Sequence, residues 1–569
     1  MSGMFCAVVP LVILCAVLSL PGHCQLNQGG VPLSIQYGLN RDGVTDLVVP
    51  PPDTLALARE DALSPVPMRF AVNLPVDVMI AVPEGIAGSP VSGIRNPAHG
   101  TWYPLPDGSG IWLCTISVPG ARALTLYFDR FRLPPGGRLF VYNKDRSKIL
   151  GAFTNRNNSP QGVFATALIP GDLITLEYNQ PATVSEHPGL HLSEIAYAYR
   201  GIRNSNSGLG FGDSGPCEVN INCPEGTGWQ DQKKGVMRIA AKKTGGTYWC
   251  SGSLVNNARQ DCTPYVLTAD HCGQDATPQH IGEWIFYFGY EAPGCPDPPV
   301  EPGFRDMSGA TLIASSGDVN IKGSDFFLVL LKDAIPDTFD VWFNGWNRQG
   351  TPAQSGTGIH HPWGDIRTIS TFTTPAVSAK WNGHTDFAHW EVKWAATPSG
   401  HGVTEGGSSG SPLFDAAGRI VGALTGGDSS CDTSALGKPD YYGKFSYSWD
   451  KNGSDSARRL DCWLDPDNTG VEILDGIPLI IPSATGLTGF QICPNPSSGI
   501  LLLRSSLFMQ SGLWQVTILD ARGITLLSES VQSGLSPALR MDISRLPAGF
   551  YLVQVRSESR SLTGRVIKL

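Results

Sequence analysis

Residues 406–412 read Gly406-Gly-Ser-Ser-Gly-Ser-Pro412, a tight glycine-rich turn that leads into the apolar residues Leu413 and Phe414. Glycine at such a turn lets backbone N–H groups approach a bound carbonyl, because no side chain stands in the way. Acyl transfer needs a hydroxyl nucleophile together with N–H donors for the developing oxyanion. Ser409 is therefore the candidate nucleophile, and the N–H groups of Gly407 and Ser409 are the candidate oxyanion donors.

Two further segments supply groups that could activate this hydroxyl. The stretch Tyr265-Val-Leu-Thr-Ala-Asp-His271-Cys272 is typical of a strand that ends in a histidine beside a cysteine. The stretch Ser324-Asp-Phe-Phe-Leu-Val-Leu-Leu331 is an apolar strand opened by Asp325, whose charge is costly there unless it is paired. The order His271, Asp325, Ser409 is that of the chymotrypsin-type triad, which predicts that these residues meet in space.

Two alternative chemistries are weaker. Asp270 lies next to His271, but adjacent residues at a strand end point away from each other, so we expect Asp325 to orient the imidazole. His360-His361 suggests zinc, but no third ligand is apparent and no CxxC pair occurs in the chain. We expect a structural role for this histidine pair and no metal or cofactor.

Composition predicts a mainly β protein with several domains. A chain of 569 residues is too long for one hydrophobic core. Only 16% of the residues are charged, whereas Gly 66 and Pro 44 are plentiful, which favours turn-rich β domains over long charged helices. The net charge of -9 offers no basic surface, so nucleic acid is not an expected partner.

The N-terminus predicts export. Residues 7–20 are almost wholly apolar and too short to span a membrane comfortably, which indicates a signal peptide at 1–24. No later run is apolar enough for a membrane helix, so we expect no span in the mature chain. Eight of the 13 cysteines fall between Cys217 and Cys462, and such a cluster in an exported chain indicates disulfides whose pairing the spacing leaves open.

The pattern of apolar segments divides the rest of the chain. Alternating or apolar runs at 123–128, 138–142 and 172–178 predict a β domain over 25–211, followed by a small, polar junction that suits processing. Short turn-bounded segments over 212–472 are typical of a two-barrel or sandwich domain. Residues 473–490 are expected to be a linker, and 491–569 a small β-sandwich with strands near 514–518 and 551–555.

Residues 212–472 resemble the lysyl endopeptidases, bacterial relatives of the trypsin-like fold. The matching stretches are Cys217-Glu-Val-Asn-Ile-Asn-Cys223, Cys250-Ser-Gly-Ser-Leu254, Leu267-Thr-Ala-Asp-His-Cys272, His360-His-Pro362 and Gly402-Val-Thr-Glu-Gly-Gly-Ser-Ser-Gly-Ser-Pro412. The resemblance implies a chymotrypsin-like double β-barrel and the disulfides Cys217–Cys431, Cys223–Cys295 and Cys250–Cys272. Cys262 and Cys462 have no counterpart in the family, and we expect them to pair with each other.

The resemblance also implies the cleavage specificity. The family's acidic residue at the base of the specificity pocket falls on Asp440, and its pocket tryptophan falls on Trp381, which would lie along the stem of a lysine. A carboxylate in a narrow pocket favours a cationic side chain, because leaving it unpaired is costly. The family has a histidine near that tryptophan, and this chain has Thr425 there.

The flanking parts resemble known pieces as well. Residues 112–181 resemble the propeptide of secreted bacterial lysyl endopeptidases, which implies folding assistance and inhibition until removal. The stretches Pro494-Asn-Pro-Ser-Ser-Gly499, Leu546-Pro-Ala-Gly-Phe-Tyr-Leu552 and Gly564-Arg-Val-Ile-Lys-Leu569 resemble a type IX secretion sorting domain. This implies handling by the type IX machinery and a secreted or outer-surface location.

We therefore expect a secreted serine endopeptidase that acts on proteins or peptides and cuts on the carboxyl side of lysine. Two alternatives stay open: arginine or dual-basic specificity, and a catalytically inactive surface binding or adhesion protein. No lysine occurs between Lys148 and Lys233, and the junction offers only Arg200 and Arg203. Either another protease matures this chain or arginine is tolerated.

Overall fold

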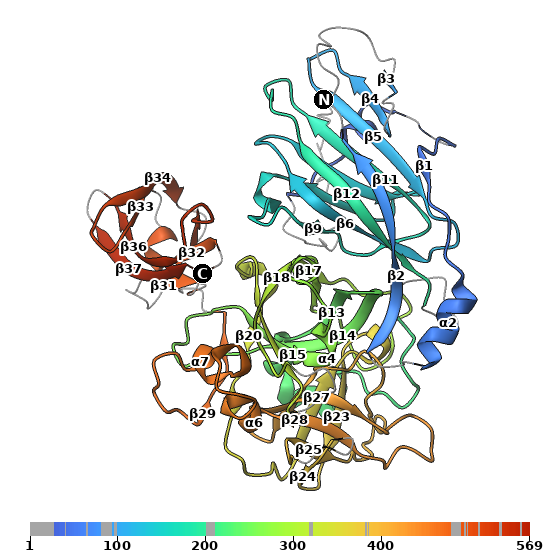
Figure 1. The fold of residues 1–569 in the computed structure, drawn as a ribbon, viewed down its shortest axis with the longest axis vertical. Helices are drawn as coiled ribbons and strands as arrows, with labels where there is room; N and C mark the ends of the chain where they lie inside the picture. The colour runs from blue at the N-terminus through green and yellow to red at the C-terminus, as the bar shows by residue number, and fades with distance from the viewer. Residues whose placement is uncertain are drawn as a thin grey trace, which may run out of the picture.

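The computed structural model describes residues 28–39, 41, 43–63, 67–80, 94–95, 99–200, 211–317, 323–381, 384, 386–479, 491–493, 495, 497, 499–509, 512–533, 538–557 and 560–568. The expected signal peptide lies outside these residues. Three units follow one another along the chain (Figure 1): an N-terminal unit, a central unit, which we call the protease unit after the resemblance given above, and a small C-terminal unit. The fold is mainly β, as the composition predicts.

The N-terminal unit is built from two sheets. One has the strand order β3-β4-β5-β11-β7-β8 with β1 paired to β5, and the other begins β10-β6-β12-β2 with β9 paired to β6. Its elements are α1 (Leu33–Gln36), β1 (Leu47–Val48), α2 (Thr54–Leu63), β2 (Met68–Met79), β3 (Ile94–Arg95), β4 (Thr101–Pro104), β5 (Gly110–Ser117), β6 (Ala123–Arg132), β7 (Arg138–Asn143), β8 (Ile149–Phe153), β9 (Phe164–Ala165), β10 (Ile169–Pro170), β11 (Leu173–Gln180) and β12 (Gly189–Ala198). The strands predicted at 123–128, 138–142 and 172–178 are confirmed by β6, β7 and β11.

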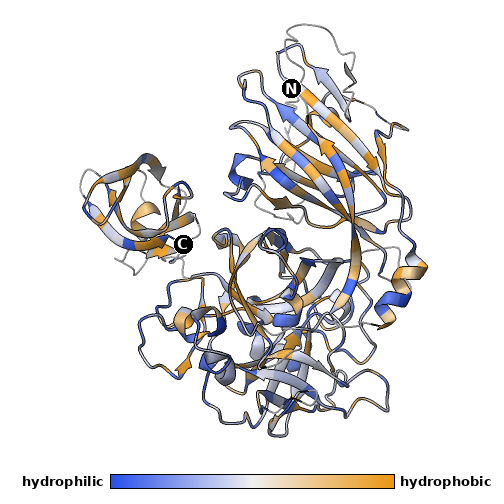
Figure 2. Cartoon of the chain, viewed as in Figure 1, coloured by the Kyte–Doolittle hydropathy of each residue, from blue (hydrophilic) through white to orange (hydrophobic). Residues whose placement is uncertain are grey.

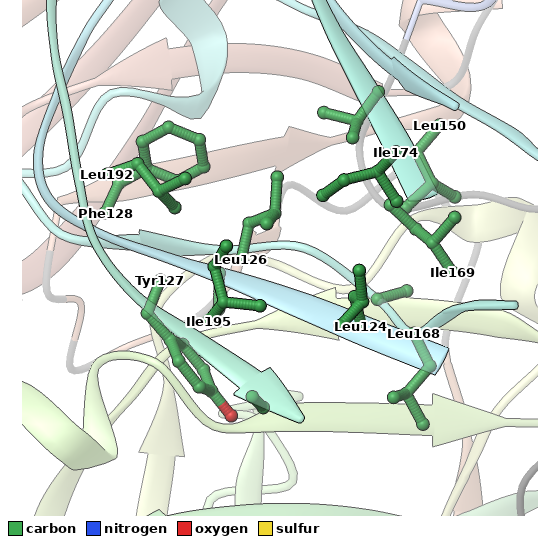
Figure 3. Packing of buried hydrophobic residues seen from close by; sticks show 14 of the residues in the cluster. Leu124, Leu126, Tyr127, Phe128, Leu150, Leu168, Ile169, Ile174, Leu192 and Ile195 are labelled. Carbon is green, nitrogen blue, oxygen red and sulfur yellow. The ribbon is translucent and has the colours of Figure 1, made fainter. Parts of the chain in front are cut away.

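The core of this unit lies between the two sheets. Leu124, Leu126 and Ile195 from one sheet and Leu150 and Ile174 from the other are all buried in a single hydrophobic cluster (Figure 3). The hydrophobic stretches along these strands can be followed in Figure 2. The same cluster continues into the protease unit through Trp249 and Tyr287.

The protease unit contains two barrel-like sheets. The first has the strands β13 (Val236–Lys243), β14 (Gly246–Leu254), β15 (Tyr265–Ala269), β16 (Ile285–Phe288), β17 (Arg305–Ser308), β18 (Ala310–Ser315) and β19 (Phe326–Leu331), with the short helix α4 (Asp270–Gly273) after β15. The second runs β23-β22-β26-β27-β28-β25-β24. Its strands are β21 (Trp346–Asn347), β22 (Gly356–His360), β23 (Thr368–Phe372), β24 (Val377–Ala379), β25 (His389–Val392), β26 (Pro412–Asp415), β27 (Ile420–Gly427) and β28 (Asp440–Lys444), followed by helices α6 (Phe445–Asp450) and α7 (Asp461–Leu464). This is the double β-barrel expected from the resemblance.

One strand joins the N-terminal and protease units. Strand β2 pairs with β12 of the N-terminal unit and, at its first residues, with β14 of the first barrel (Figure 1). The partners across this junction are Met68 with Trp249, Arg69 with Tyr248, and Ala71 with Thr247. The two units therefore share one continuous sheet.

The expected linker at 473–490 needs a correction at its start. Strand β29 (Ile473–Leu474) pairs with β21, and β30 (Ile477–Pro478) pairs with β20 (Trp342–Phe343). Composition alone could not reveal this packing, because two-residue strands carry too little pattern to be recognised. Residues 473–479 thus belong to the protease unit.

The C-terminal unit contains two small sheets, ordered β31-β32-β35 and β34-β33-β36-β37. Its strands are β31 (Gln491–Cys493), β32 (Ile500–Arg504), β33 (Gly512–Leu519), β34 (Thr525–Ser533), β35 (Ala538–Asp542), β36 (Gly549–Arg556) and β37 (Ser561–Lys568). Strands β33 and β36 confirm the two strands predicted near 514–518 and 551–555. No helix in the described part of the chain is long and apolar enough to cross a membrane.

The three disulfides that the resemblance implies are formed, whereas the fourth pairing, expected apart from it, is not. Cys217–Cys431, Cys223–Cys295 and Cys250–Cys272 are formed. The expected bond between Cys262 and Cys462 is wrong. Cys262 is buried in the core of the first barrel, whereas Cys462 is exposed on α7, and no disulfide joins them in the described residues.

Candidate active site

His271 and Asp325 meet at one edge of the first barrel. Strands β15 and β19 are antiparallel and Ala269 lies opposite Phe326, so the residues just beyond these two positions are close in space. Oδ2 of Asp325 lies 2.8 Å from Nδ1 of His271, and Oδ1 accepts a hydrogen bond of 3.0 Å from the His271 backbone N–H. Both side chains are buried. One carboxylate therefore fixes the ring and the backbone of the histidine together.

Asp325 adopts a strained backbone conformation. Its φ of 52° lies in the left-handed region, which non-glycine residues rarely occupy away from functional sites and turns. Its carbonyl oxygen accepts a 2.9 Å hydrogen bond from the N–H of Asp270, so the segment around His271 holds Asp325 at three points. The imidazole Nδ1 of His271 faces Asp325.

Ser409 lies beside the histidine segment. It is in the turn before β26, and its carbonyl oxygen accepts a 2.8 Å hydrogen bond from the N–H of Ser251. The same oxygen lies 3.9 Å from Sγ of Cys272, the residue that follows His271. Nε2 of His271 is buried and has no hydrogen-bond partner among the described residues. The ring nitrogen on the side away from Asp325 is thus available for a proton.

The turn before Ser409 requires glycine. Gly407 has a φ of 94°, and a Cβ built there would lie 2.9 Å from the backbone N of Gly364 and 2.9 Å from the carbonyl oxygen of His361. Ser251 ties the turn from the other side, because its Oγ donates a 2.9 Å hydrogen bond to the Gly407 carbonyl and accepts one of 3.0 Å from the His361 N–H. The backbone at Gly407 is therefore held rigidly.

The His360-His361 pair packs behind this turn. The two ring nitrogens of His360 each lie 2.9 Å from a serine hydroxyl, Nδ1 from Ser408 and Nε2 from Ser370. Burial lowers the pKa of His360 to about 3, so its imidazole is neutral. These contacts are structural, and the described residues hold no group of three or more potential metal ligands.

Asp440 is fully buried at the start of β28. Its Oδ2 accepts hydrogen bonds from Trp394 Nε1 at 2.6 Å, Thr404 Oγ1 at 2.7 Å and Ser429 Oγ at 2.6 Å. Its Oδ1 accepts one bond of 3.2 Å, from the N–H of Ser429. Burial raises the pKa of the Asp440 carboxyl above its usual range, and these hydrogen bonds act in the opposite direction.

The end of β27 connects the serine to this carboxylate. The carbonyl oxygen of Leu424 accepts a 2.8 Å hydrogen bond from the N–H of Gly410, next to Ser409. At the other end, a Cβ on Gly427 would lie 2.1 Å from Oδ1 of Asp440. Between them, a Cβ on Gly426 would lie 3.3 Å from the indole of Trp381. We call residues 424–427 the pocket wall, after the specificity pocket proposed below, and the indole of Trp381 covers Gly426 of this wall.

Sequence reasoning singled out the residues of the candidate site but not the residues that contact them. The residues that it did not single out are Ser251, His389, Trp394, Thr404 and Ser429. Ser251 and Thr404 carried a signal, since each lies in a stretch that resembles the family. The others contact the site from separate strands or loops, which no local pattern reveals.

Two segments match known families. Residues 211–443 match the lysyl endopeptidase C-terminal domain, and residues 491–569 match a secretion system C-terminal sorting domain. A lysyl endopeptidase of Pseudomonas aeruginosa is 28% identical over 370 residues, which cover 61% of this chain and 75% of that protein.

Two solved structures are also similar to part of the chain. The protease Anisep of Arthrobacter nicotinovorans is 20% identical with a TM-score of 0.27, covering 37% of this chain and 90% of that chain. The MamO protease domain of Magnetospirillum magneticum is 13% identical with a TM-score of 0.25, covering 38% of this chain and 94% of that chain.

The family matches, taken with the double-barrel fold, define the class: the protein is a serine endopeptidase that is secreted or held at the cell surface. Within it, residues 211–443 are similar to the lysyl endopeptidase C-terminal domain, and residues 491–569 are similar to a secretion system C-terminal sorting domain.

Proposed function

We propose that the protein hydrolyses peptide bonds on the carboxyl side of lysine and that His271, Asp325 and Ser409 are its catalytic triad. The observation that carries this proposal is the double hold of Asp325 on His271, through both Nδ1 and the backbone N–H. A carboxylate in this position selects the tautomer with a proton on Nδ1, which leaves Nε2 as the base.

In this mechanism Nε2 of His271 takes the proton of Ser409 as Oγ attacks the carbonyl carbon of the substrate. Asp325 stabilises the imidazolium that forms, and the N–H groups of Gly407 and Ser409 hold the oxyanion of the tetrahedral intermediate. His271 then gives the proton to the leaving amine, and water releases the acyl group by the same steps in reverse. The glycine at 407 supports this role, because the tight packing there leaves room only for backbone.

The hydrogen bonds of Asp440 favour lysine over arginine. Oδ2 already accepts three hydrogen bonds from protein donors, whereas Oδ1, which faces Gly427, accepts one. A guanidinium binds a carboxylate best through both oxygens at once, but an ammonium is a compact charge that needs only one acceptor. Asp440 therefore suits a single-point ion pair with a lysine Nζ at Oδ1.

Mapping of the cut sites in a digest of a denatured protein tests the proposal. We expect the processed enzyme to cleave after lysine. The Ser409→Ala variant should give no detectable cleavage, because its activity should be lower than that of the wild type by a factor of about 10⁴ or more. Abundant cleavage after arginine would establish dual-basic specificity instead. A processed wild-type protein that cuts nothing and fails to react with a fluorophosphonate at Ser409 would be a binding protein.

We further propose that the N-terminal unit is a propeptide that blocks the site until it is removed. Strand β2 extends the sheet of the first barrel, and the side chain of Met68 at its start packs against the catalytic turn. A Cβ on Gly406 would lie 3.4 Å from Cβ and 3.8 Å from Sδ of Met68. Because Gly406 precedes the proposed oxyanion donor, Met68 covers the surface where a substrate carbonyl must enter.

Further contacts support a stable attachment of the propeptide. Phe70 stacks on Trp249 with ring centroids 4.0 Å apart, and Tyr127 shares a 2.8 Å hydrogen bond with Thr247. The buried Lys242 forms an ion pair with Glu194 of β12. Paired strands, stacked rings and the ion pair of the buried Lys242 bind the two units over an extended surface, so cutting the junction by itself is not expected to release the propeptide.

A further inference from the structure

His389 is a buried imidazole that the triad does not use. It is the first residue of β25, where it lies opposite Gly443 of β28 and Ala379 of β24, and it is 1% exposed. Its Nε2 lies 3.0 Å from Oγ1 of Thr425 in the pocket wall. Its ring centroid lies 6.0 Å from that of Trp381, with the planes inclined by 32°. It therefore contacts both Thr425 of the pocket wall and Trp381, which covers the wall.

The His389 imidazole is uncharged at neutral pH. Burial lowers the pKa of His389 to about 4, and the nearby charges of His384 and Lys444 act in the same direction, whereas the carboxylate of Asp325 opposes them. Nδ1 of His389 has no hydrogen-bond partner in the described residues. A buried N–H without a partner is rarer in proteins than an unpaired acceptor. The favoured tautomer thus has its proton on Nε2 and donates it to Thr425 Oγ1.

Thr425 lies at a break in the sheet. Along β27 and β28, Leu424 pairs with Tyr442 and Gly426 with Tyr441, so Thr425 is the extra residue of a bulge. Bulges near active sites re-aim a side chain, and an extra residue outside the ladder needs another contact to fix it. Thr425 is itself buried, and the hydrogen bond from His389 meets this need.

We propose that His389 is a positioning residue of the specificity pocket: it holds the Thr425 bulge and backs the indole of Trp381, and so maintains the discrimination of lysine from arginine. This inference rests on the proposed function. The pocket wall joins the Ser409 turn to Asp440. A shift of the Thr425 bulge therefore changes the width of the pocket through which the substrate side chain reaches Oδ1 of Asp440. A looser wall admits the wider guanidinium.

The two amide analogues of histidine provide matched variants. The side-chain amide nitrogen of glutamine can take the position of Nε2, whereas that of asparagine stands near Nδ1, where His389 has no partner. We expect His389→Gln to keep the hydrogen bond to Thr425 and His389→Asn to lose it. The measurement is kcat/KM on two peptides that differ only in lysine or arginine before the scissile bond.

The expected result is a fall of about tenfold in the lysine-to-arginine ratio of kcat/KM for His389→Asn, and a change of less than about twofold for His389→Gln, as the loss of one hydrogen bond predicts. The fall should come mainly from a lower KM for the arginine peptide, because the looser wall admits the guanidinium while the triad is untouched. Thr425→Val should give a similar fall, and the double variant His389→Asn/Thr425→Val should add little to either.

An unchanged ratio in both His389→Asn and Thr425→Val would overturn the proposal. Equal losses of kcat/KM on the two peptides, together with a lowered melting temperature of the variant, would also overturn it. Such losses indicate only a structural role. If His389→Asn does not fold, the ratio measured for Thr425→Val decides. A wild-type enzyme that shows no preference for lysine rejects the proposed function itself, and the pocket that His389 would position is rejected with it.

Discussion

At the scale of single residues, the proposed lysine specificity depends on the charge of Asp440. The side chain is fully buried, and its neutral donors satisfy its oxygens without cancelling its charge. Asp440→Asn keeps the shape and removes the charge, so we expect kcat/KM on a lysine peptide to fall by a factor of about 10² to 10³. Asp428→Asn removes an exposed charge from the same loop and is expected to have little effect. Equal losses for both variants would show that general electrostatics, not Asp440, binds the substrate.

The raised pKa of Asp440 adds a dependence on pH. Below this pKa the carboxyl is neutral and cannot pair with a cation, so affinity for a cation is lost as the pH falls. Because burial raises the pKa of Asp440, the affinity for a cation should begin to fall at a higher pH than it would for an aspartate with the usual pKa. The inhibition constant of n-butylamine, a mimic of the lysine side chain, should therefore rise on mild acidification. An inhibition constant that stays flat down to the usual range of aspartate would contradict this.

At the scale of elements, the disulfide Cys250–Cys272 joins β14 to the start of α4 and lies next to His271. Its sequence separation of 22 residues gives a loop-closure contribution of about 3 kcal/mol. We expect Cys250→Ala/Cys272→Ala to lower the free energy of unfolding by roughly this amount. It should also lower kcat, because Cys272 follows His271 and its Sγ lies 3.9 Å from the carbonyl oxygen of Ser409.

The disulfide Cys223–Cys295 provides the control for this prediction. It closes a longer loop, with a separation of 72 residues, and is expected to contribute about 4 kcal/mol. Its removal should therefore destabilise the protein at least as much but leave kcat nearly unchanged at temperatures where the variant is folded. Urea unfolding and kcat on a lysine peptide measure the two effects, and a kcat that follows stability in both variants would refute a specific role for Cys250–Cys272.

At the scale of the whole molecule, the continuous sheet makes the N-terminal unit part of the fold of the uncut chain. If Met68 covers the catalytic turn, labelling of Ser409 by a fluorophosphonate should be slow in the full chain. We expect Met68→Ala to accelerate labelling by about tenfold, because truncation of this buried side chain uncovers Gly406. Met79→Ala changes an exposed methionine at the far end of the same strand and should leave the rate unchanged. Fast labelling of the unaltered full chain would exclude inhibition by this unit.

Local sequence patterns predicted the parts of this protein that depend on neighbouring residues. The apolar runs predicted β6, β7, β11, β15 and β19, because alternation and β-branched or aromatic composition act within one strand. The glycine turn at 406–412, the histidine at the end of β15 and the aspartate before β19 could be recognised for the same reason. The family resemblance added the three disulfides and the pocket residues Asp440 and Trp381.

Only the tertiary structure decided the contacts between distant strands. The donors of Asp440, the hydrogen bond from His389 to the Thr425 bulge, and the packing of Met68 on Gly406 all depend on strand register and barrel closure. The pairing expected between Cys262 and Cys462 was wrong for the same reason, since one side chain faces the core of the first barrel and the other faces solvent. Apolar residues at every second position of a strand predict that their side chains face inward. Which partner each side chain meets there is determined by long-range packing, which no single segment encodes.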